Sequence, residues 1–177
     1  MISLDTKMIT EGQKMEIKVN LLRDNANLPY KKHINDAGYD ISWAPSNLSD
    51  LPDRWLNGQL TKHVLTIKPG QSVVLETGLR VLFDRGYVME VKNRSGIASK
   101  KSLLVGAHII DHTYRGEIFV NLHNVSDKEQ YIQAGDRIAQ FIVYKVENCV
   151  FESIDKNIYD NNTTERGDGG FGSTGLK

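Results

Sequence analysis

Short segments that are hydrophobic, or that alternate between hydrophobic and polar residues, recur through most of the chain. The first begins at Met15, where Ile17, Val19 and Leu21 alternate with polar residues. A period of two places alternate side chains on one face of a strand. Frequent turn residues and the lack of a long amphipathic pattern favour an all-β sandwich or barrel. Further strands are expected at residues 64–67, 72–76, 79–83, 87–92, 130–132 and 137–143.

The segment Gly106–Asn124 combines this pattern with polar residues of interest. Two isoleucines lead into the polar run 111–116, and a strict alternation with aliphatic residues on one face follows. This pattern predicts a hairpin made of a strand, a tight polar turn and a returning strand. An ordinary turn can also use an aspartate and a half-buried tyrosine. Asp111 and Tyr114, three positions apart at the predicted hairpin mouth, are nevertheless candidates for chemistry.

Residues 45–62 interrupt the strand pattern. Ser49 or Asp50 suits the N-cap of a short helix that continues through Trp55 and ends at Gly58. We interpret the segment as an insertion on a β scaffold, and its sequence suggests no role.

Arg94, Ser95 and Gly96 follow one of the predicted strands directly. They offer a guanidinium, a hydroxyl and an unobstructed backbone amide at one bend, and this set suits a phosphate group. Later in the chain, Gln140 interrupts a nearly apolar strand. It is expected either to face a cleft or to be a satisfied amide in the core.

Composition excludes several functional classes. The chain has 22 basic and 22 acidic residues, so no net field draws it to nucleic acid or to a membrane surface. The single cysteine, Cys149, allows no internal disulfide and suits a reducing compartment, and its apolar neighbours suggest a packed thiol. No segment resembles a signal peptide or a membrane span. We expect a soluble, intracellular and cytoplasmic protein, with the nucleus or a virus-infected cell as alternatives.

Near its end the chain becomes rich in glycine, and residues 166–175 read RGDGGFGSTG. Glycine loses much backbone entropy on ordering, so such a segment cannot hold one conformation unaided. A plain linker would not need an arginine, an aromatic residue and a Ser-Thr pair, whereas an arm that folds over a ligand would. We therefore expect a loose leader at 1–14, a β-barrel domain at 15–155 that contains the 45–62 insertion, and a flexible arm at 156–177.

Five motifs in this order resemble those of the trimeric deoxyuridine triphosphatase (dUTPase) family. They are AGYDIS from Ala37, RSGIASK from Arg94, VGAHIIDHTYRGEI from Val105, GDRIAQFIV from Gly135 and RGDGGFGSTG from Arg166. Each motif alone is weak, but together they span most of the chain. The resemblance implies a jelly-roll-like distorted β-barrel with a flexible glycine-rich C-terminal arm, assembled as a homotrimer with shared active sites. It also implies hydrolysis of dUTP to dUMP and pyrophosphate, which keeps uracil out of DNA and supplies dUMP for thymidylate synthesis.

The resemblance also implies roles for the matching residues. Asp111 would hold the attacking water, and Tyr114 would pack against the deoxyribose. Asp40 would reach a Mg²⁺ ion through a water molecule. The backbone at 108–110 and the facing strand near Phe119 would read the uracil. The implied substrate-binding residues are Arg94, Ser95, Gly96, His108, Ile109, Ile110, Tyr114, Phe119, Gln140, Arg166, Phe171, Gly172, Ser173 and Thr174.

Three features depart from the family pattern: Asn93 replaces a usual proline, His108 replaces a frequent glycine, and the 45–62 insertion is unusual. Two other functions remain open. A dCTP deaminase shares the barrel, but it needs a glutamate base where this chain has Asp111. A dUTP-binding regulatory protein could use the same site as a switch, and only the insertion favours that role. Because the chain keeps every catalytic-type residue of the motifs, the sequence favours an enzyme.

Overall fold

The computed structural model describes residues 15–169. The predicted leader at 1–14 and the arm from residue 170 onward lie outside the described residues. The chain divides into two compact units, with the division between Val146 and Glu147. The boundary predicted at residue 155 therefore falls within the second unit.

Strands dominate the first unit, as the sequence predicted. Its helical elements are a short 3₁₀ helix at Leu48–Asp50 and the helix α1 at Ser95–Lys101. The strands are β1 (Lys18–Leu21), β2 (Tyr39–Ser42), β3 (Arg54–Leu56), β4 (Gln59–Thr61), β5 (Val64–Ile67), β6 (Ser72–Glu76), β7 (Leu79–Leu82), β8 (Tyr87–Asn93), β9 (Leu103–Val105), β10 (Ile109–Asp111), β11 (Phe119–Asn124), β12 (Gln130–Gln133) and β13 (Arg137–Lys145).

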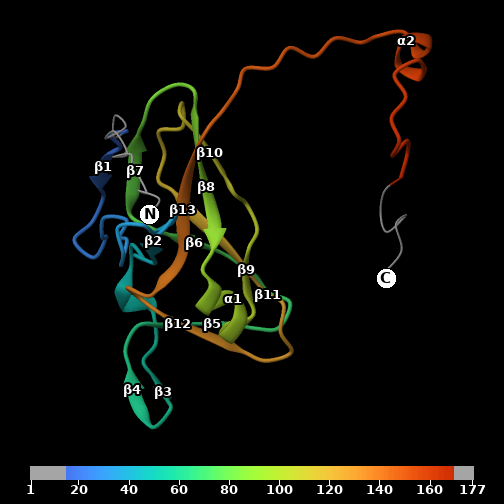
Figure 1. The fold of residues 1–177 in the computed structure, drawn as a ribbon. Coiled ribbons are helices and arrows are strands. Elements are labelled where there is room, and N and C mark those ends of the chain that lie inside the picture. The colour runs from blue at the N-terminus through green and yellow to red at the C-terminus, as the bar shows by residue number, and fades with distance from the viewer. Residues whose placement is uncertain (1–14, 170–177) are drawn as a thin grey trace, which may run out of the picture. The chain divides into compact units, whose positions relative to one another are not determined.

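Two larger sheets organise this unit (Figure 1). One has the strand order β10-β8-β13-β2 and the other has the order β6-β11-β9, while β1–β7, β5–β12 and β3–β4 form two-stranded ladders. Every named pair is antiparallel. The unit is an all-β, jelly-roll-like fold, which confirms the predicted fold class.

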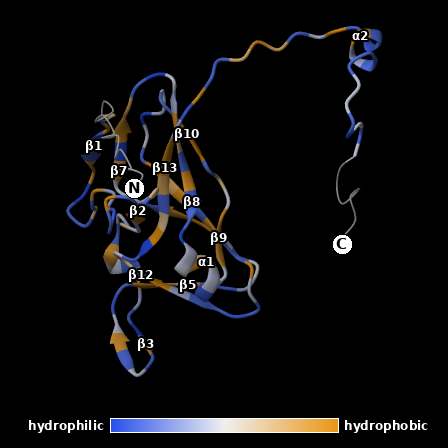
Figure 2. Cartoon of the chain, in the orientation of Figure 1, coloured by the Kyte–Doolittle hydropathy of each residue, from blue (hydrophilic) through white to orange (hydrophobic). Residues whose placement is uncertain are grey.

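The inward faces of these sheets form one hydrophobic core. Along β11 the predicted alternation is confirmed, since Val120 and Leu122 are fully buried whereas Phe119 is 44% exposed. In Figure 2 the hydrophobic residues gather on the strands and the connecting loops are mostly hydrophilic. Fully buried side chains include Ile41, Ile67, Leu79, Leu103, Ile118, Ile132, Ile138 and Phe141.

The predicted hairpin at 109–124 is wrong in its strand pairing. Both strands exist, but β10 pairs with β8, whereas β11 pairs with β6 and β9 in the other sheet. The connection 112–118 therefore crosses between two sheets and does not close a tight turn. As a result β10 is an edge strand of its sheet.

The helix predicted between Ser49 and Gly58 is also wrong, because β3 and β4 form a two-stranded hairpin there. Its turn residues, Asn57 and Gly58, have φ values of 51° and 76°. Such left-handed residues suit the two-residue turns that match the twist of a hairpin, and the Asn-Gly pair is a strong signal for them. The predicted bend at Arg94 is followed directly by helix α1, which the sequence analysis did not predict.

The described part of the second unit contains the helix α2, Lys156–Asp160. Asp155 caps this helix by accepting the Asn157 N–H at 2.8 Å. Cys149 is exposed, as are Val150 and Phe151, so the prediction of a packed thiol is wrong. The segment 147–155 contains no strand and no buried residue, so it has no core of its own to cover the thiol. Within residues 15–169, no helix is long and apolar enough to cross a membrane.

Candidate functional site

A cavity of about 220 Å³ opens where β10 ends and the crossing connection leads into β11. Because these two strands belong to different sheets, the space between them is not closed by a hydrogen-bonded ladder. The lining residues are Ile109, Ile110, Asp111, Tyr114, Glu117, Ile118 and Phe119. Five of these seven were predicted as site residues from the sequence.

The edge of β10 that does not face β8 has backbone groups without a strand partner in the described part of the chain. The Val91 N–H donates to the His108 carbonyl at 2.8 Å, which makes this a hydrogen-bonded pair. Bonded and non-bonded pairs alternate along an antiparallel ladder. Ile110 therefore directs its backbone groups to β8, whereas Ile109 and Asp111 direct theirs to the free edge.

The side chain of His108 turns back onto its own sheet. Its Nδ1 lies 3.1 Å from the Val91 carbonyl oxygen. The imidazole therefore has a local partner, and the substitution of histidine for the family's frequent glycine leaves the free edge of β10 intact.

Asp111 is exposed at the end of β10. Its carbonyl accepts the Tyr114 N–H at 3.0 Å, and the Tyr114 hydroxyl donates to the Glu117 carbonyl at 2.8 Å. Among residues 15–169, the Asp111 carboxylate has no hydrogen-bond or ion-pair partner, so it can accept a bond from a ligand or from water. The loop after β10 is thus fixed by hydrogen bonds of its own, and the Asp111 carboxylate remains available to a ligand or to water.

A second group of predicted residues meets at the other end of the same sheet. Arg94 donates through Nε to Asp40 Oδ1 at 2.7 Å and through Nη1 to the Arg137 carbonyl at 3.0 Å. Arg137 donates to Asp40 Oδ2 at 3.0 Å. A guanidinium has five N–H groups, so Arg94 keeps several for an anion. Ser95 and Gly96, both exposed, begin α1 beside it.

Gln140 belongs to this second group. It donates from Nε2 to the Asn93 carbonyl at 2.7 Å, so it is a satisfied and partly exposed amide. A Cβ at Gly38 would lie 1.9 Å from Gln140 Oε1, so the glycine of the AGYDIS motif makes room for the amide. Asn93 accepts the Val105 N–H through Oδ1 at 2.7 Å, a bond that the family's usual proline could not make.

The two groups do not meet within one chain. Asp111 pairs with Val88 near the start of β8, whereas Arg94 follows the last residue of that strand, six positions beyond Val88. At about 3.3 Å per residue, this separates the two by about 20 Å. This is a separation of backbone positions, and the two side chains together cannot span it.

A magnesium ion would find no ready set of direct ligands here. No group of three or more His, Cys, Asp or Glu side chains is positioned to hold a metal within residues 15–169. Both Asp40 oxygens accept guanidinium bonds, but each keeps a second lone pair. Asp40 therefore keeps the capacity for a contact made through a metal-bound water.

The arm residues do not belong to the first unit. Arg166 belongs to the second unit, where its Nε donates to the Gly169 carbonyl at 2.8 Å. The predicted ligands Phe171, Gly172, Ser173 and Thr174 lie outside the described residues.

Sequence reasoning assigned no role to three residues of these groups, namely Gly38, Glu117 and Arg137. Arg137 and Glu117 were visible as charges inside nearly apolar or alternating segments. Their partners are distant in sequence, with 97 positions between Asp40 and Arg137 and 94 between Arg23 and Glu117. Local pattern carries no information about such pairs.

Comparison with known proteins identifies the family of this chain. The dUTPase family model matches residues 59–175. A deoxyuridine 5'-triphosphate nucleotidohydrolase of Hydrogenobaculum sp. is 36% identical over 165 residues, covering 92% of this chain and 100% of the relative. One of Yarrowia lipolytica is 33% identical over 162 residues, covering 92% of this chain and 90% of the relative.

Solved structures show the same fold. A Staphylococcus bacteriophage 80alpha dUTPase with dUpNHpp superposes with a TM-score of 0.72 at 25% identity, covering 91% of this chain and 99% of that one. The dUTPase from phage phi11 of S. aureus superposes with a TM-score of 0.63 at 22% identity, covering 80% and 97%. With a family model that spans most of the chain and relatives that align over nearly their whole length, this chain belongs to the dUTPase family.

Proposed function

We propose that this protein hydrolyses dUTP to dUMP and pyrophosphate. The main support for this proposal is the cavity between β10 and β11, which combines a free strand edge, an available carboxylate and an aromatic ring. The curated relatives are named for the same reaction, deoxyuridine 5'-triphosphate nucleotidohydrolase. The reaction would keep uracil out of DNA and supply dUMP for thymidylate synthesis.

In this proposal the free edge of β10 reads the base. Uracil presents an N–H donor between two carbonyl acceptors, and an unpaired strand edge offers backbone N–H and C=O groups in complementary order. Ile109 provides both groups, and Phe119 borders the opposite side of the cavity. Cytosine carries an amino donor in place of one acceptor, so the same edge would reject it.

Asp111 would orient the attacking water and accept its proton. Positioning a nucleophile in line with the bond that breaks, with water otherwise excluded, lowers the barrier of phosphoanhydride hydrolysis. Tyr114 would pack against the deoxyribose, where a ribose would have to fit its 2′-hydroxyl. The deaminase alternative is not supported, because the glutamate that lines the cavity within residues 15–169, Glu117, has its carboxylate engaged by Arg23 and Gly78.

The phosphates would be held by the second group, Arg94, Ser95, Gly96 and Gln140, from a neighbouring subunit. The supporting observation is the separation of about 20 Å between Asp111 and Arg94 along β8. We therefore propose a homotrimer with shared sites. Each site would be closed by a third subunit's arm, with Arg166 and the 172–174 segment on the phosphates and Phe171 on the uracil.

We further propose that Mg²⁺ accompanies the triphosphate. A phage phi11 dUTPase structure is described with a structural Mg(II) ion. Bound to phosphate oxygens, the ion would neutralise charge that builds up at the phosphates. Asp40 would accept a hydrogen bond from one of its waters. A cytoplasmic location is proposed because the nucleotide substrate is intracellular.

A substrate panel tests the function. Pyrophosphate release should be measured with magnesium on dUTP, dCTP, dTTP and UTP, for the wild type and for Asp111→Asn. We expect hydrolysis of dUTP to exceed the others by orders of magnitude, and kcat of the variant to fall about a hundredfold or more. Equal rates on UTP and dUTP would refute the substrate, and near-normal turnover by Asp111→Asn would remove that residue from the chemistry.

A further inference from the structure

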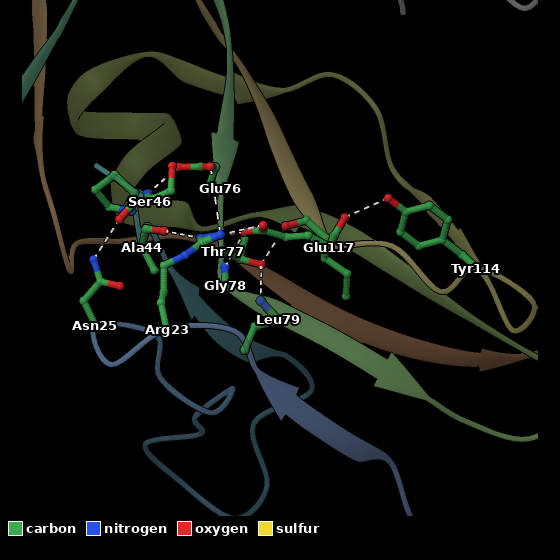
Figure 3. Close-up of polar contacts among 12 residues, drawn as sticks. Arg23, Asn25, Ala44, Ser46, Glu76, Thr77, Gly78, Leu79, Tyr114 and Glu117 are labelled. Carbon is green, nitrogen blue, oxygen red and sulfur yellow. Dashed lines mark hydrogen bonds and ion pairs between the residues drawn. The ribbon is translucent and has the colours of Figure 1, made fainter. Parts of the chain in front are cut away.

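An ion pair that the sequence analysis did not identify holds the connection between β10 and β11 (Figure 3). Arg23 donates from Nη1 and Nη2 to Oε1 and Oε2 of Glu117, at 2.8 and 2.6 Å. The Gly78 N–H also donates to Oε1, at 2.7 Å. The two side chains are only 18% and 12% exposed. Two parallel charge-assisted bonds fix direction as well as distance, so this pair is rigid.

Arg23 connects the pair to distant parts of the scaffold. It donates to the Ala44 carbonyl at 2.8 Å and lies 3.9 Å from Glu76, whose other oxygen accepts the Ser46 N–H at 2.6 Å. These residues follow β2 or end β6. Gly78 contributes by its lack of a side chain, because a Cβ there would lie 2.5 Å from Ala26 Cβ. Glu117 is therefore held in place by contacts that connect it to several strands.

The other side of Glu117 supports Tyr114. The Tyr114 hydroxyl donates to the Glu117 carbonyl at 2.8 Å, and Figure 3 shows the ring reaching this carbonyl from across the loop. A Cβ on Gly116 would lie 2.4 Å from the Tyr114 hydroxyl, so the glycine leaves space for the ring. The peptide unit that receives this bond is held from two directions, by the Arg23 pair on the Glu117 side chain and by the Ile118 N–H on the Leu79 carbonyl.

The strand after the loop has an anchor of its own. The Ile118 N–H donates to the Leu79 carbonyl at 2.8 Å, and Thr77 Oγ1 donates to the Ile118 carbonyl at 2.7 Å. These bonds do not involve Arg23. Loss of the arginine should therefore loosen the loop without detaching β11 from the fold.

Charge gives Arg23 a second effect. Glu117 lines the cavity, and a nucleoside triphosphate brings several negative charges to its mouth. A partly buried carboxylate without a counter-charge would repel such a ligand, and buried charges are costly unless paired.

We propose that Arg23 is a positioning residue for sugar selection. It acts through Glu117 to hold Tyr114 against the deoxyribose, and it neutralises a carboxylate beside the nucleotide. This inference rests on the proposed hydrolysis of dUTP. Arg23 lies outside the five motifs of the family and is far in sequence from the residues that line the cavity.

Arg23→Met tests the proposal, with Arg80→Met as the matched control. Arg80 is an exposed residue of β7, and no carboxylate in residues 15–169 forms an ion pair with it. In Arg23→Met we expect kcat/KM for dUTP to fall about tenfold, mainly through KM, the scale of one lost charge-assisted bond. The preference for dUTP over UTP should shrink by a similar factor. Arg80→Met should change neither value.

Hydrogen exchange of the backbone supplies a readout that needs no substrate. Amides of the segment 111–117 should exchange about tenfold faster in Arg23→Met and at the wild-type rate in Arg80→Met. Unchanged exchange would overturn the inference, and so would faster exchange with unchanged discrimination between dUTP and UTP, because the pair would then be only structural. A wild type that does not hydrolyse dUTP would instead refute the proposed function.

Arg23→Lys keeps the test usable if the methionine variant does not fold. Lysine restores the charge but cannot make two parallel bonds to one carboxylate. We expect Arg23→Lys to recover much of the dUTP affinity. The amides of 111–117 should still exchange faster than in the wild type, and the preference for dUTP over UTP should stay reduced. Wild-type discrimination in Arg23→Lys would overturn the role of the bidentate geometry.

Discussion

Two inactive variants should restore activity to each other if the active site is shared between chains. The first variant is Asp111→Asn, which removes the acid at the cavity but leaves Arg94 intact. The second is Arg94→Met, which removes the free guanidinium donors but leaves Asp111 intact. Arg137 still pairs with Asp40 in the second variant, at 3.0 Å, so that acid is not left alone.

The expected magnitude follows from the separation of the two groups. Because the backbones at Asp111 and Arg94 lie about 20 Å apart on one chain, the proposed site combines them from different chains. Each variant alone should retain at most about 1% of wild-type activity. When equal amounts assort at random, about one site in four receives both intact contributions. If one variant makes up a fraction f of the mixture, the recovered fraction of wild-type activity should equal about f(1−f) and should be highest when the two variants are mixed equally.

The assay is pyrophosphate release from dUTP after mild unfolding and refolding of the mixtures. The control mixes Asp111→Asn with a chain that carries both substitutions, which should recover nothing. Native mass spectrometry confirms that mixed oligomers have formed. Mixed oligomers without recovered activity would refute the shared site, and would mean that Asp111 and Arg94 of one chain come together in a conformation other than the one described here.

Other predictions concern single features of the chain. Tyr114→Ala should narrow the kcat/KM gap between dUTP and UTP, because the ring would no longer exclude a 2′-hydroxyl, and an unchanged ratio would contradict this role. Truncation after Glu165 should leave Tm nearly unchanged, because so glycine-rich a segment can add little to a core, but activity should collapse; a fully active truncated protein would reduce the arm to a linker. Gly116→Ala should lower the free energy of unfolding in urea by about 1–3 kcal/mol, because its Cβ would crowd the Tyr114 hydroxyl. Replacing Arg54–Thr61 with two glycines should change neither kcat nor Tm, since β3 and β4 form a separate two-stranded sheet within the described part of the chain, and lost activity would give the insertion a catalytic part.

Local signals were enough to predict most strands and to single out candidate residues that line the cavity between β10 and β11. The predicted ranges of β5 and β6 agree with the structure to the residue, because a run of strand-forming residues between turn residues is a local property. Asp111 and Tyr114 were recognised in the same way, from an acid and a ring at a strand exit. The helix predicted in the insertion failed because a weak capping signal was preferred to the Asn57-Gly58 turn.

Strand partners were beyond the reach of local pattern. The alternation along β11 showed which of its faces is buried, and this was confirmed, but nothing in it specified β6 and β9 as neighbours instead of β10. That choice of partner opens the cavity and leaves the edge of β10 free. A true hairpin would have consumed the same backbone groups in its own ladder.

The sequence by itself determined the strand pattern, the motifs of the family and the candidate residues for the chemistry, because periodicity and motif spacing are properties of the chain itself. The tertiary structure alone decided which of those residues meet. It separated Asp111 from Arg94 along β8, joined Arg94 to Asp40, and brought Arg23 to Glu117 across 94 positions. Such contacts arise from how sheets stack around a common core, and that packing depends on all strands together.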